Sequence, residues 1–407
     1  MIGLKRIKER FYLPTDAWVL ALTAAIWSVG GSMANPYQSI YFSAVGANSL
    51  FIGYLLAISS TVTALMQLIG GYVADAWGRR KVIVTFSFIS ATSAFVYIFI
   101  MQCQLLIIPI LLASIAGVYG PAFNAILADS MQPELRVRGI ACFTLITSLP
   151  SVFFPYVGGT LMRVYGTLNG LRIAYFVSGL FGLIGVSYRA LKLKETYSGA
   201  KTSKPIEFRS LFSSFFTDNL YILRHTGSGI KMLLIFSVLV SLGTGMTVPY
   251  TSLYVINTLG VQPDLYGIVT NIAGLISVVL LLPATRIVEK VGLRKSVTYA
   301  SLSIPVYQLI FVRASGMDDL VAWGVLGSAS NALLGPSFTA LQASLSTRET
   351  RGRIMALFSV SSLVTTIPAQ IFGGYLYNSL GQSTPFLASI PMFVLATIVL
   401  TKVKETQ

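Results

Sequence analysis

Twelve apolar stretches follow one another along the chain, and most are separated by only a few polar residues. A transmembrane helix needs about 20 predominantly apolar residues, and each stretch is close to that length or longer. The sequence therefore predicts an all-α membrane protein with twelve transmembrane helices. Charged residues make up 11% of the chain, against about 25% in soluble domains, which excludes a soluble globular protein. The predicted spans are residues 17–44, 50–74, 81–101, 104–130, 139–162, 171–191, 231–257, 264–288, 296–313, 319–344, 353–377 and 384–401.

One long interruption, residues 192–230, divides the spans into two sets of six. We expect an N-terminal six-helix bundle over residues 1–191, a cytoplasmic central loop over 192–230, and a C-terminal six-helix bundle over 231–407. Apolar residues in the loop follow helical spacing, which predicts an amphipathic helix in the cytoplasmic interface. A solvated linker with an apolar patch is the alternative. These apolar residues are Phe208, Leu211, Phe212, Phe215, Phe216, Ile222 and Leu223.

Basic residues are distributed unequally between the two sides of the predicted membrane. With the N-terminus in the cytoplasm, 26 of the 29 basic residues lie on the cytoplasmic side, Arg189 among them, and Arg163, Arg172 and Arg313 lie outside. Cytoplasmic loops are enriched in Lys and Arg, so we expect a multi-pass protein of the cell membrane with both termini in the cytoplasm. The net charge of +15 is thus attributed to topology and to lipid headgroups of the bilayer, and we expect no nucleic-acid partner.

The two halves of the sequence are related by an internal repeat with an offset near 213 residues. A repeat of six helices in the same orientation implies two pseudo-symmetric six-helix bundles, with a solute site between them near the membrane midplane. The matching residues are Gly30 with Gly243, Met33 with Met246, Pro36 with Pro249, Tyr37 with Tyr250, Ser39 with Ser252, Tyr41 with Tyr254, Gly53 with Gly267, Gly120-Pro121 with Gly335-Pro336, Phe123 with Phe338, Arg138-Gly139 with Arg351-Gly352, and Gly158-Gly159 with Gly373-Gly374.

A polar motif joins the second and third predicted spans: Gly71-Tyr-Val-Ala-Asp75-Ala-Trp-Gly78-Arg79-Arg80-Lys81. A tight loop between two helices favours glycine where the backbone angles are unusual. Asp75 can accept hydrogen bonds from the N-terminal amides of a neighbouring helix, and Arg79 can pair with Asp129 at the end of the fourth span. The alternative is that Arg79, Arg80 and Lys81 only set the topology.

This motif resembles the G-x-x-x-D-x-x-G-R-K/R signature of the major facilitator superfamily, and the twelve spans, central loop and duplication extend the resemblance over the whole chain. The resemblance implies that the motif cluster latches the two halves on the cytoplasmic side in the outward-open state. Ala76 departs from the family, where arginine is frequent at that position. An altered copy in the second half has Glu289 in place of Asp75, Gly292 in place of Gly78, and Arg294-Lys295 in place of Arg80-Lys81.

Two further segments are similar to the drug-efflux branch of this superfamily. The run from Gly120 to Asp129, followed by Arg138-Gly139, resembles the region between the fourth and fifth spans of that branch. Pro155-x-x-Gly158-Gly159 matches only the end of the antiporter motif, because Phe154 replaces the preceding glycine. Helix bending and close packing are an equally good explanation of this proline and glycine pair.

The superfamily resemblance also implies which spans line the solute cavity, namely the first, fourth, seventh and tenth. Polar groups at this depth usually face the protein interior, which predicts a neutral cavity rich in amides and tyrosines. Each side chain could instead form a hydrogen bond between helices. The predicted cavity residues are Asn35, Tyr37, Gln38, Tyr41, Asn124, Tyr250, Tyr254, Asn271, Asn331 and Gln370.

These observations favour a monomeric secondary or facilitative transporter of a small organic solute, with drug-type efflux as the leading hypothesis. An importer of sugars or other neutral metabolites is the alternative, and a non-transporting receptor or channel-like protein is the alternative class. We expect no enzyme activity, no cofactor and no metal. The single histidine, His225, lies in the central loop, so no histidine is left for a Ser–His pair or a zinc site within the membrane.

The 14 acidic residues are all assigned to span ends or loops, and none to the midplane. Proton-driven carriers generally need a titratable group within the membrane. We therefore expect facilitated transport, or loose proton coupling through Asp75 and Asp129. Asp264 is assigned to an outer span end in this scheme.

Overall fold

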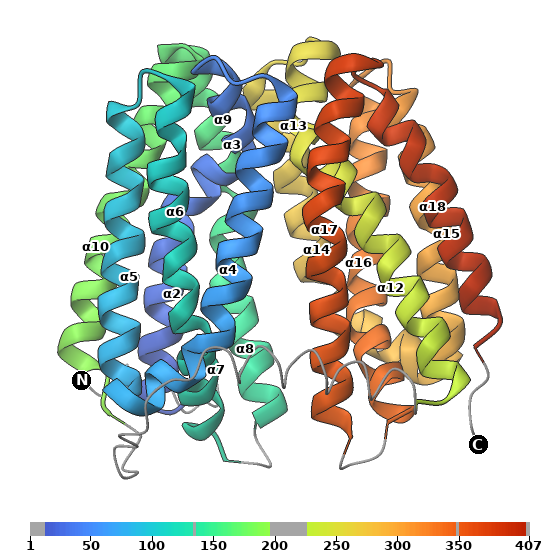
Figure 1. The fold of residues 1–407 in the computed structure, drawn as a ribbon, viewed down its shortest axis with the longest axis horizontal. Helices are drawn as coiled ribbons and strands as arrows, with labels where there is room; N and C mark the ends of the chain where they lie inside the picture. The colour runs from blue at the N-terminus through green and yellow to red at the C-terminus, as the bar shows by residue number, and fades with distance from the viewer. Residues whose placement is uncertain (1–12, 133–135, 196–225, 347–349, 404–407) are drawn as a thin grey trace. The chain divides into compact units, whose positions relative to one another are not determined.

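The computed structural model describes residues 13–132, 136–195, 226–346 and 350–403, and this part of the chain is helical, without strands (Figure 1). The amphipathic helix predicted around 208–223 lies outside the described residues. The chain forms two compact units, each containing a segment from the other half of the sequence. Unit 1 comprises residues 1–48, 58–203 and 255–271, and unit 2 comprises residues 49–57, 204–254 and 272–407. The predicted domain boundaries at 191 and 231 stay a prediction.

Unit 1 contains the helices of the first six predicted spans, apart from the first turns of α4. Each predicted span corresponds to one helix or to two or three consecutive helical segments. These are α2 (Thr15–Ala34), a 3₁₀ turn (Asn35–Tyr37) and α3 (Gln38–Ala44); α4 (Ser49–Trp77); α5 (Arg79–Val96); α6 (Ile107–Ile115) and α7 (Tyr119–Asp129); α8 (Arg136–Ser148) and α9 (Phe154–Tyr165); and α10 (Thr167–Lys192).

Unit 2 repeats this order, and the first turns of its α14 belong to unit 1. Its elements are α12 (Ser228–Thr247), a 3₁₀ turn (Val248–Tyr250), α13 (Thr251–Leu253) and a π-helical segment (Tyr254–Thr258); α14 (Pro263–Val291); α15 (Leu293–Val312); α16 (Met317–Ser344); α17 (Arg351–Ser379); and α18 (Thr384–Thr401).

Proline explains where the first helix of each repeat is interrupted. Pro36 and Pro249 occupy matching positions, and each lies in the 3₁₀ turn that interrupts the helix. Proline lacks the amide hydrogen that the α-helical ladder needs and its ring clashes with the preceding turn. The duplicated interruption is therefore encoded by the duplicated proline.

Ten described helices are long and apolar enough to cross a membrane. The remaining two predicted spans form α15 and α16, which are 20 and 28 residues long but less apolar. Serine and glycine dilute the apolar character of α16, whose sequence includes Gly-Ser-Ala-Ser-Asn between residues 327 and 331. Twelve membrane crossings therefore stay a prediction, while a membrane protein with many apolar helices is established.

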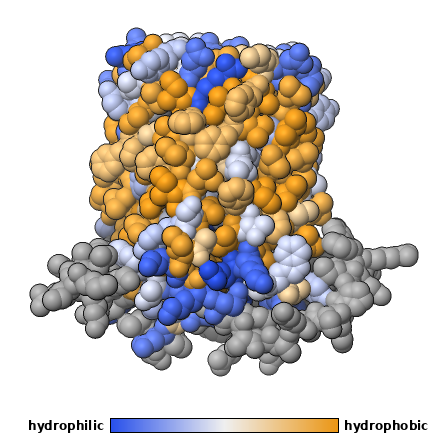
Figure 2. Space-filling view, turned by 90° about the vertical axis from the view of Figure 1, so that its left-hand side faces the viewer, coloured by the Kyte–Doolittle hydropathy of each residue, from blue (hydrophilic) through white to orange (hydrophobic). Residues whose placement is uncertain are grey.

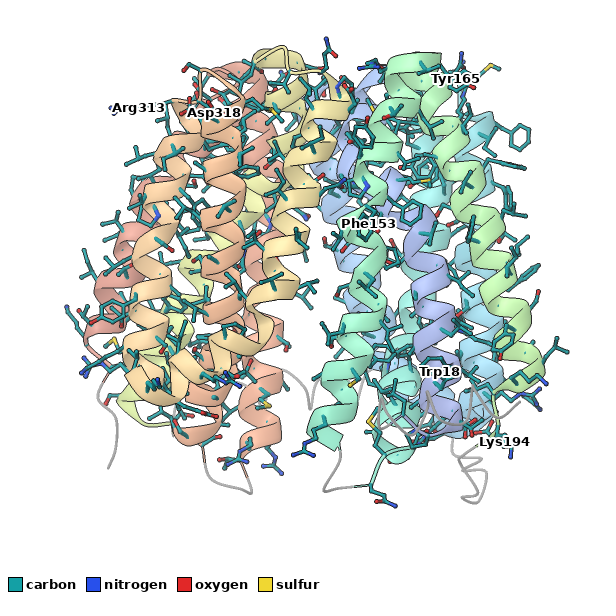
Figure 3. The ribbon with its side chains drawn as sticks, turned by 180° about the vertical axis from the view of Figure 1, so that it is seen from behind. Trp18, Phe153, Tyr165, Lys194, Arg313 and Asp318 are labelled. Atoms are coloured by element: carbon teal, nitrogen blue, oxygen red, sulfur yellow. The ribbon has the colours of Figure 1, made fainter. Side chains whose placement is uncertain are left out.

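The outer surface of the helices matches a lipid environment. The face drawn in Figure 2 carries a broad belt of hydrophobic side chains between hydrophilic ends. Large apolar side chains such as Phe88, Phe176 and Ile184 are exposed on α5 and α10, which is the expected arrangement when lipid replaces water as solvent. Figure 3 labels Trp18 and Lys194 near one end of unit 1 and Tyr165 near the other.

Each unit has its own apolar core. In unit 1 the core joins α2, α5 and α7 through Leu20, Ile83 and Ile126, all fully buried. In unit 2 the corresponding core includes Leu233, Val297 and Leu341 from α12, α15 and α16. These cores fix the helices whose polar side chains form the sites described next.

Candidate functional site

Gly78 lies directly before helix α5, in the motif between α4 and α5. Its φ of +93° lies in the left-handed region, which glycine adopts without a steric penalty. A Cβ at this position would lie 2.8 Å from a carboxylate oxygen of Glu195. That carboxylate accepts a hydrogen bond of 3.1 Å from the amide of Arg80, so it lies at the positive end of the α5 dipole.

Glu195 thus occupies the position at the helix N-terminus that sequence reasoning gave to Asp75. The Asp75 side chain is half-buried and makes no hydrogen bond or ion pair with the described residues. Glu195 was missed because it lies more than a hundred residues further along the chain. Its place directly after the sixth span was the only available signal.

The two arginines of the motif connect α5 to other helices of unit 1. Arg79 Nη1 lies 2.5 Å from Asp129 Oδ2 at the end of α7, which confirms the predicted pair. Arg80 Nη2 donates a hydrogen bond of 2.6 Å to the carbonyl of Ala190 in α10. Because the Asp129 side chain is 53% exposed, we expect the ion pair to contribute only about 0.2–1 kcal/mol to stability.

The altered motif of unit 2 preserves the turn. Gly292 lies directly before α15 with a φ of +92°, and Arg294 donates to the carbonyl of Thr401, the last residue of α18. Arg80 makes the corresponding bond near the end of α10. Glu289 is exposed, and so is Arg138 at the start of α8. The repeated glycine and arginine therefore have a shared structural role in starting and anchoring a helix.

Glycines in α9 and α14 allow three very close backbone contacts in unit 1. A Cβ on Gly158 would lie 2.1 Å from the carbonyl oxygen of Met33, and a Cβ on Gly159 would lie 2.3 Å from that of Pro263. Gly267 of α14 in turn faces the backbone of Tyr156, whose Cα would lie 2.7 Å from an added Cβ. Small residues permit such backbone approaches between membrane helices.

Unit 2 contains the same contacts at the repeated positions. A Cβ on Gly373 of α17 would lie 2.5 Å from the carbonyl oxygen of Met246, and one on Gly374 would lie 2.5 Å from that of Ser49. Gly53 of α4 faces the carbonyl oxygen of Gln370 at 2.7 Å by the same measure. The close-packing explanation of the glycine pairs is therefore supported in both units.

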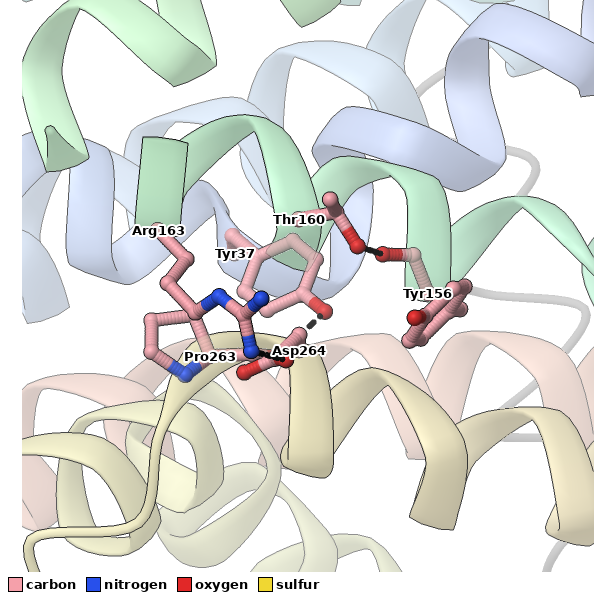
Figure 4. A network of polar contacts seen from close by, with 6 residues as sticks. All are labelled: Tyr37, Tyr156, Thr160, Arg163, Pro263 and Asp264. Carbon is pink, nitrogen blue, oxygen red and sulfur yellow. Dashed lines mark hydrogen bonds and ion pairs between the residues drawn. The ribbon is translucent and has the colours of Figure 1, made fainter. Parts of the chain in front are cut away.

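A buried tyrosine lies beside each set of glycines. The Tyr37 hydroxyl donates to the carbonyls of Pro155 at 2.8 Å and Pro263 at 3.0 Å as alternative acceptors, and Figure 4 shows it between α9 and the start of α14. The Tyr250 hydroxyl donates to the carbonyl of Gln370 at 2.6 Å. Both tyrosines are fully buried, so each connects helices rather than facing a cavity.

An ion pair accompanies the contact in unit 1. Arg163 Nη1, in the last turn of α9, lies 2.7 Å from Asp264 Oδ2 in the first turn of α14 (Figure 4). The Asp264 side chain is only 5% exposed, whereas that of Arg163 is 57% exposed. The second carboxylate oxygen of Asp264 is buried without a hydrogen-bond partner among the described residues. Asp264, which the sequence analysis assigns to an outer span end, is therefore a buried carboxylate.

Other residues predicted to line the cavity also connect backbone segments. Tyr41 donates to the carbonyl of Tyr97, and Tyr254 donates to that of Val312 at 3.3 Å. Asn271 in α14 accepts from the amide of Tyr156 and donates to a carbonyl in the turn before α9, both at 3.3 Å. These contacts correspond to the alternative of hydrogen bonds between helices.

A cavity of about 410 Å³ lies within unit 1 and is formed by α2, α7, α8 and α10. Two predicted residues, Asn35 and Asn124, line it, whereas Gln38, Asn331 and Gln370 do not. Asn331 is exposed on α16. The full lining is Ala24, Trp27, Ser28, Gly31, Ser32, Asn35, Tyr119, Gly120, Phe123, Asn124, Thr147 and Arg189.

Arg189 is a lining residue that sequence reasoning did not predict for the cavity. It was counted with the basic residues of the cytoplasmic side, and the structure buries its side chain inside unit 1 with 3% exposure. Its Nε donates to Thr23 Oγ1 and its Nη1 to Ser87 Oγ, both at 2.8 Å. The guanidinium carbon lies 5.4 Å from the centre of the Phe123 ring, within the range of a cation–π interaction.

Comparison with known proteins identifies the family. The sequence matches the profile of the Major Facilitator Superfamily over residues 20–239 and 233–407. The chain belongs to this superfamily, and its relatives are transport proteins rather than enzymes.

Individual relatives are distant. The chain is 23% identical to the uncharacterized MFS-type transporter YqjV of Bacillus subtilis, over 52% of this chain and 51% of that protein. It is 23% identical to the multidrug resistance protein MdtG of Proteus mirabilis, over 88% of each chain. Among solved structures, the nucleoside transporter NupG superposes with a TM-score of 0.73 at 15% identity, covering 94% of this chain and 99% of NupG. The last comparison concerns the fold alone.

Proposed function

We propose that this chain carries a small organic solute across the cell membrane by alternating access and that the cavity of unit 1 forms part of the solute site. The observation that carries this proposal is the cavity lining, which combines amides, hydroxyls and aromatic rings within a membrane-spanning unit. Pockets for small molecules typically pair apolar walls with a few polar groups that fix orientation. Similarity to MdtG and PmrA, which are named as multidrug resistance and efflux proteins, favours efflux.

The glycine contacts support a mechanism with two states. Those of Gly159, Gly267, Gly53 and Gly374 join helices from the two halves of the sequence without intervening side chains, whereas those of Gly158 and Gly373 lie within one half. Backbone contacts of this kind can separate as rigid surfaces, since no interlocking side chains hold them together. In the proposed cycle the four contacts between the two halves of the sequence separate when the opposite gate, at the motif, closes.

Transport by the purified protein is the direct test. Saturable flux of a solute panel into and out of proteoliposomes, absent from protein-free vesicles, is the expected result. Asn35→Ala combined with Asn124→Ala should raise KM several-fold, because each lost hydrogen bond is worth about 0.5–1.5 kcal/mol. The matched control is Asn331→Ala, since Asn331 does not line this cavity. Solute binding without flux would instead indicate a receptor, and non-saturable flux a channel.

The direction of transport is tested in the same vesicles. Under an imposed proton gradient, loosely coupled efflux predicts that solute accumulates in inside-out vesicles, and the importer alternative predicts accumulation in right-side-out vesicles. Without coupling, the solute equilibrates in both orientations and the carrier is facilitative.

We also propose that both termini and the central loop are cytoplasmic, because the basic residues favour that side. In a background with Cys103→Ser and Cys142→Ser, single cysteines in 44–49 and 258–263 should react with an impermeant thiol reagent applied to intact cells. Cysteines in 192–230 should not react. Labelling of the central loop from outside would overturn this orientation.

Energy coupling is proposed to be absent or loose, acting through Asp75 and Asp129 near the motif. Solute flux driven only by an imposed pH gradient should be weak, and it should disappear when both residues are replaced by asparagine. Strong uphill accumulation in that double variant would show that another group couples transport to protons.

A further inference from the structure

Arg189 holds its positive charge well inside unit 1. Helix α10 ends where α2 and α5 begin (Figure 1), and its side chains tilt toward its own N-terminus. The side chain of Arg189 therefore extends into the unit rather than out toward its end. Its partner Thr23 lies eight residues after the start of α2 at Thr15, which is about 12 Å along the helix. Ser87 lies equally far from the start of α5 at Arg79.

Among the described residues, no carboxylate pairs with the charge of Arg189. Both hydrogen-bond partners are neutral hydroxyls, and the third neighbour is a phenyl ring. Among the described residues the two ion pairs involve Arg79 and Arg163. The C-terminal end of the α10 dipole offsets part of the charge. A buried cation with only neutral partners is nevertheless unfavourable compared with one paired to an anion.

The guanidinium retains donors for a ligand. Nη2 makes no hydrogen bond with a described residue, whereas Nε and Nη1 are oriented by their hydroxyl partners. Thr23 Oγ1 can accept from Arg189 because its own proton points to the carbonyl of Val19 at 2.8 Å. A guanidinium fixed in this way can hold a carboxylate with good geometry.

The second half of the sequence indicates that the fold does not require this cation. The repeat places Phe236 at the position of Thr23 and Phe338 at that of Phe123. In unit 2 these two rings pack against each other with centroids 5.4 Å apart, and Phe236 is buried. The same place in the repeat is thus filled by apolar packing in unit 2 and by a charged hydrogen-bonded group in unit 1.

We propose that Arg189 is an anion-binding residue of the unit 1 cavity and that the transported solute carries a carboxylate or a similar anionic group. This inference rests on the proposed transport function and specifies its substrate class. The aromatic side chains Trp27, Tyr119 and Phe123 line the same cavity. They suit a solute whose anionic group is attached to an apolar or aromatic body.

The test compares solutes that differ mainly in charge. Phenylacetate, phenylacetamide and phenethylamine are titrated into the purified full-length protein, and binding is followed by quenching of tryptophan fluorescence. Trp27→Phe identifies the part of the signal that comes from the cavity. We expect phenylacetate to bind at least tenfold more tightly than the amide and the amine.

Three variants assign that preference to Arg189. Arg189→Gln should weaken phenylacetate binding at least tenfold and leave phenylacetamide binding unchanged, while Arg189→Lys should retain part of the preference. Arg172→Gln is the matched control, because Arg172 lies on the same helix and donates to the carbonyl of Ile100 instead. If Arg189→Gln does not fold, the double substitution Thr23→Phe with Arg189→Leu copies the apolar packing of unit 2 and should show the same loss.

Equal binding of the three solutes by the unsubstituted protein would overturn the inference, as would an anion preference that survives loss of Arg189. Failure of the proposed function has a different signature. Saturable flux without an anion preference removes this inference and leaves transport intact. Binding of phenylacetate that depends on Arg189, with no flux of any solute, supports the anion site and removes the transport proposal.

Discussion

Around Tyr37, unit 1 combines a buried hydroxyl, three glycine contacts and the ion pair between Arg163 and Asp264. Around Tyr250, unit 2 repeats the hydroxyl and the glycine contacts. Leu50 and Asn378 stand at the repeated positions of Asp264 and Arg163 in unit 2. The comparison separates the backbone contact, which both copies of the repeat encode, from a charge pair that only one copy has.

Glycine substitutions should have the largest effect, and a similar one in both units. Gly159→Ala and Gly374→Ala each place a Cβ against a backbone carbonyl, and relieving such a clash costs about 1–3 kcal/mol or more. We expect both variants to melt at lower temperature in detergent and to lose transport.

Gly335→Ala is the matched control for these substitutions. It lies in helix α16 with nothing within 4 Å of an added Cβ, and alanine favours a helix over glycine by about 1 kcal/mol. Unchanged or higher stability is expected for this control. A harmless Gly159→Ala would contradict the backbone contact in unit 1.

Removing the ion pair should destabilise unit 1 and leave unit 2 unchanged. The loss should also depend on which partner is replaced. Arg163→Met leaves the buried Asp264 carboxylate without its partner, whereas Asp264→Asn leaves an arginine that water already reaches. Because Arg163 is more than half exposed, we expect about 1 kcal/mol for Arg163→Met and less for Asp264→Asn. Thermal unfolding of both variants, with Asn378→Met as the control in unit 2, measures the difference. Equal losses for the two partners would refute the assigned asymmetry.

Each tyrosine hydroxyl should contribute less to stability than the glycine contacts do. The contribution should be similar in the two units. Tyr37→Phe and Tyr250→Phe each keep the buried ring and remove one donor, for which about 0.5–1.5 kcal/mol is expected. Tyr299→Phe, an exposed position on α15, should be neutral. A large loss for only one of the two buried tyrosines would mean that the repeat has diverged at this contact.

Substitutions in the two copies of the motif should have the smallest effects on stability. They should differ in their effect on transport. Asp75→Asn is expected to impair flux more than Glu289→Gln, since Asp75 is half-buried in the intact motif and Glu289 is exposed. It should also shift the protein toward the inward-open state if the motif forms the proposed latch. Cysteine accessibility on both sides of the membrane reports this shift. Identical flux in the two variants would count against the latch.

Several features could be predicted because they depend on local sequence. The apolar stretches gave the helices to within a few residues, the motif glycines marked helix starts, and Arg79 lay at a span end opposite Asp129. Other features depend on partners far apart in the chain. Arg189 is buried only because α2 and α5 supply hydroxyls at Thr23 and Ser87, and hydropathy alone could not distinguish it from the neighbouring lysines.

The tyrosines that were predicted to line the cavity also depend on partners far apart in the chain. Tyr37, Tyr41, Tyr250 and Tyr254 have the composition expected of a cavity lining, but their hydroxyls bind backbone carbonyls on other segments. A single sequence identifies a polar group within the membrane without identifying its acceptor. The repeat could have helped, because a tyrosine retained beside a retained glycine pair suggests a packing role.

The segment exchange between the units has a consequence for biosynthesis. Unit 1 includes residues 255–271, which the ribosome delivers well after the rest of that unit has been made. At about 5–20 residues per second, the chain waits several seconds between residue 203 and residue 271. During that interval Gly159 and Tyr37 lack the backbone of Pro263 as a partner. The nascent first half therefore stays incompletely packed in the bilayer until the start of α14 is inserted, and a chain that stops before residue 255 cannot complete its own packing.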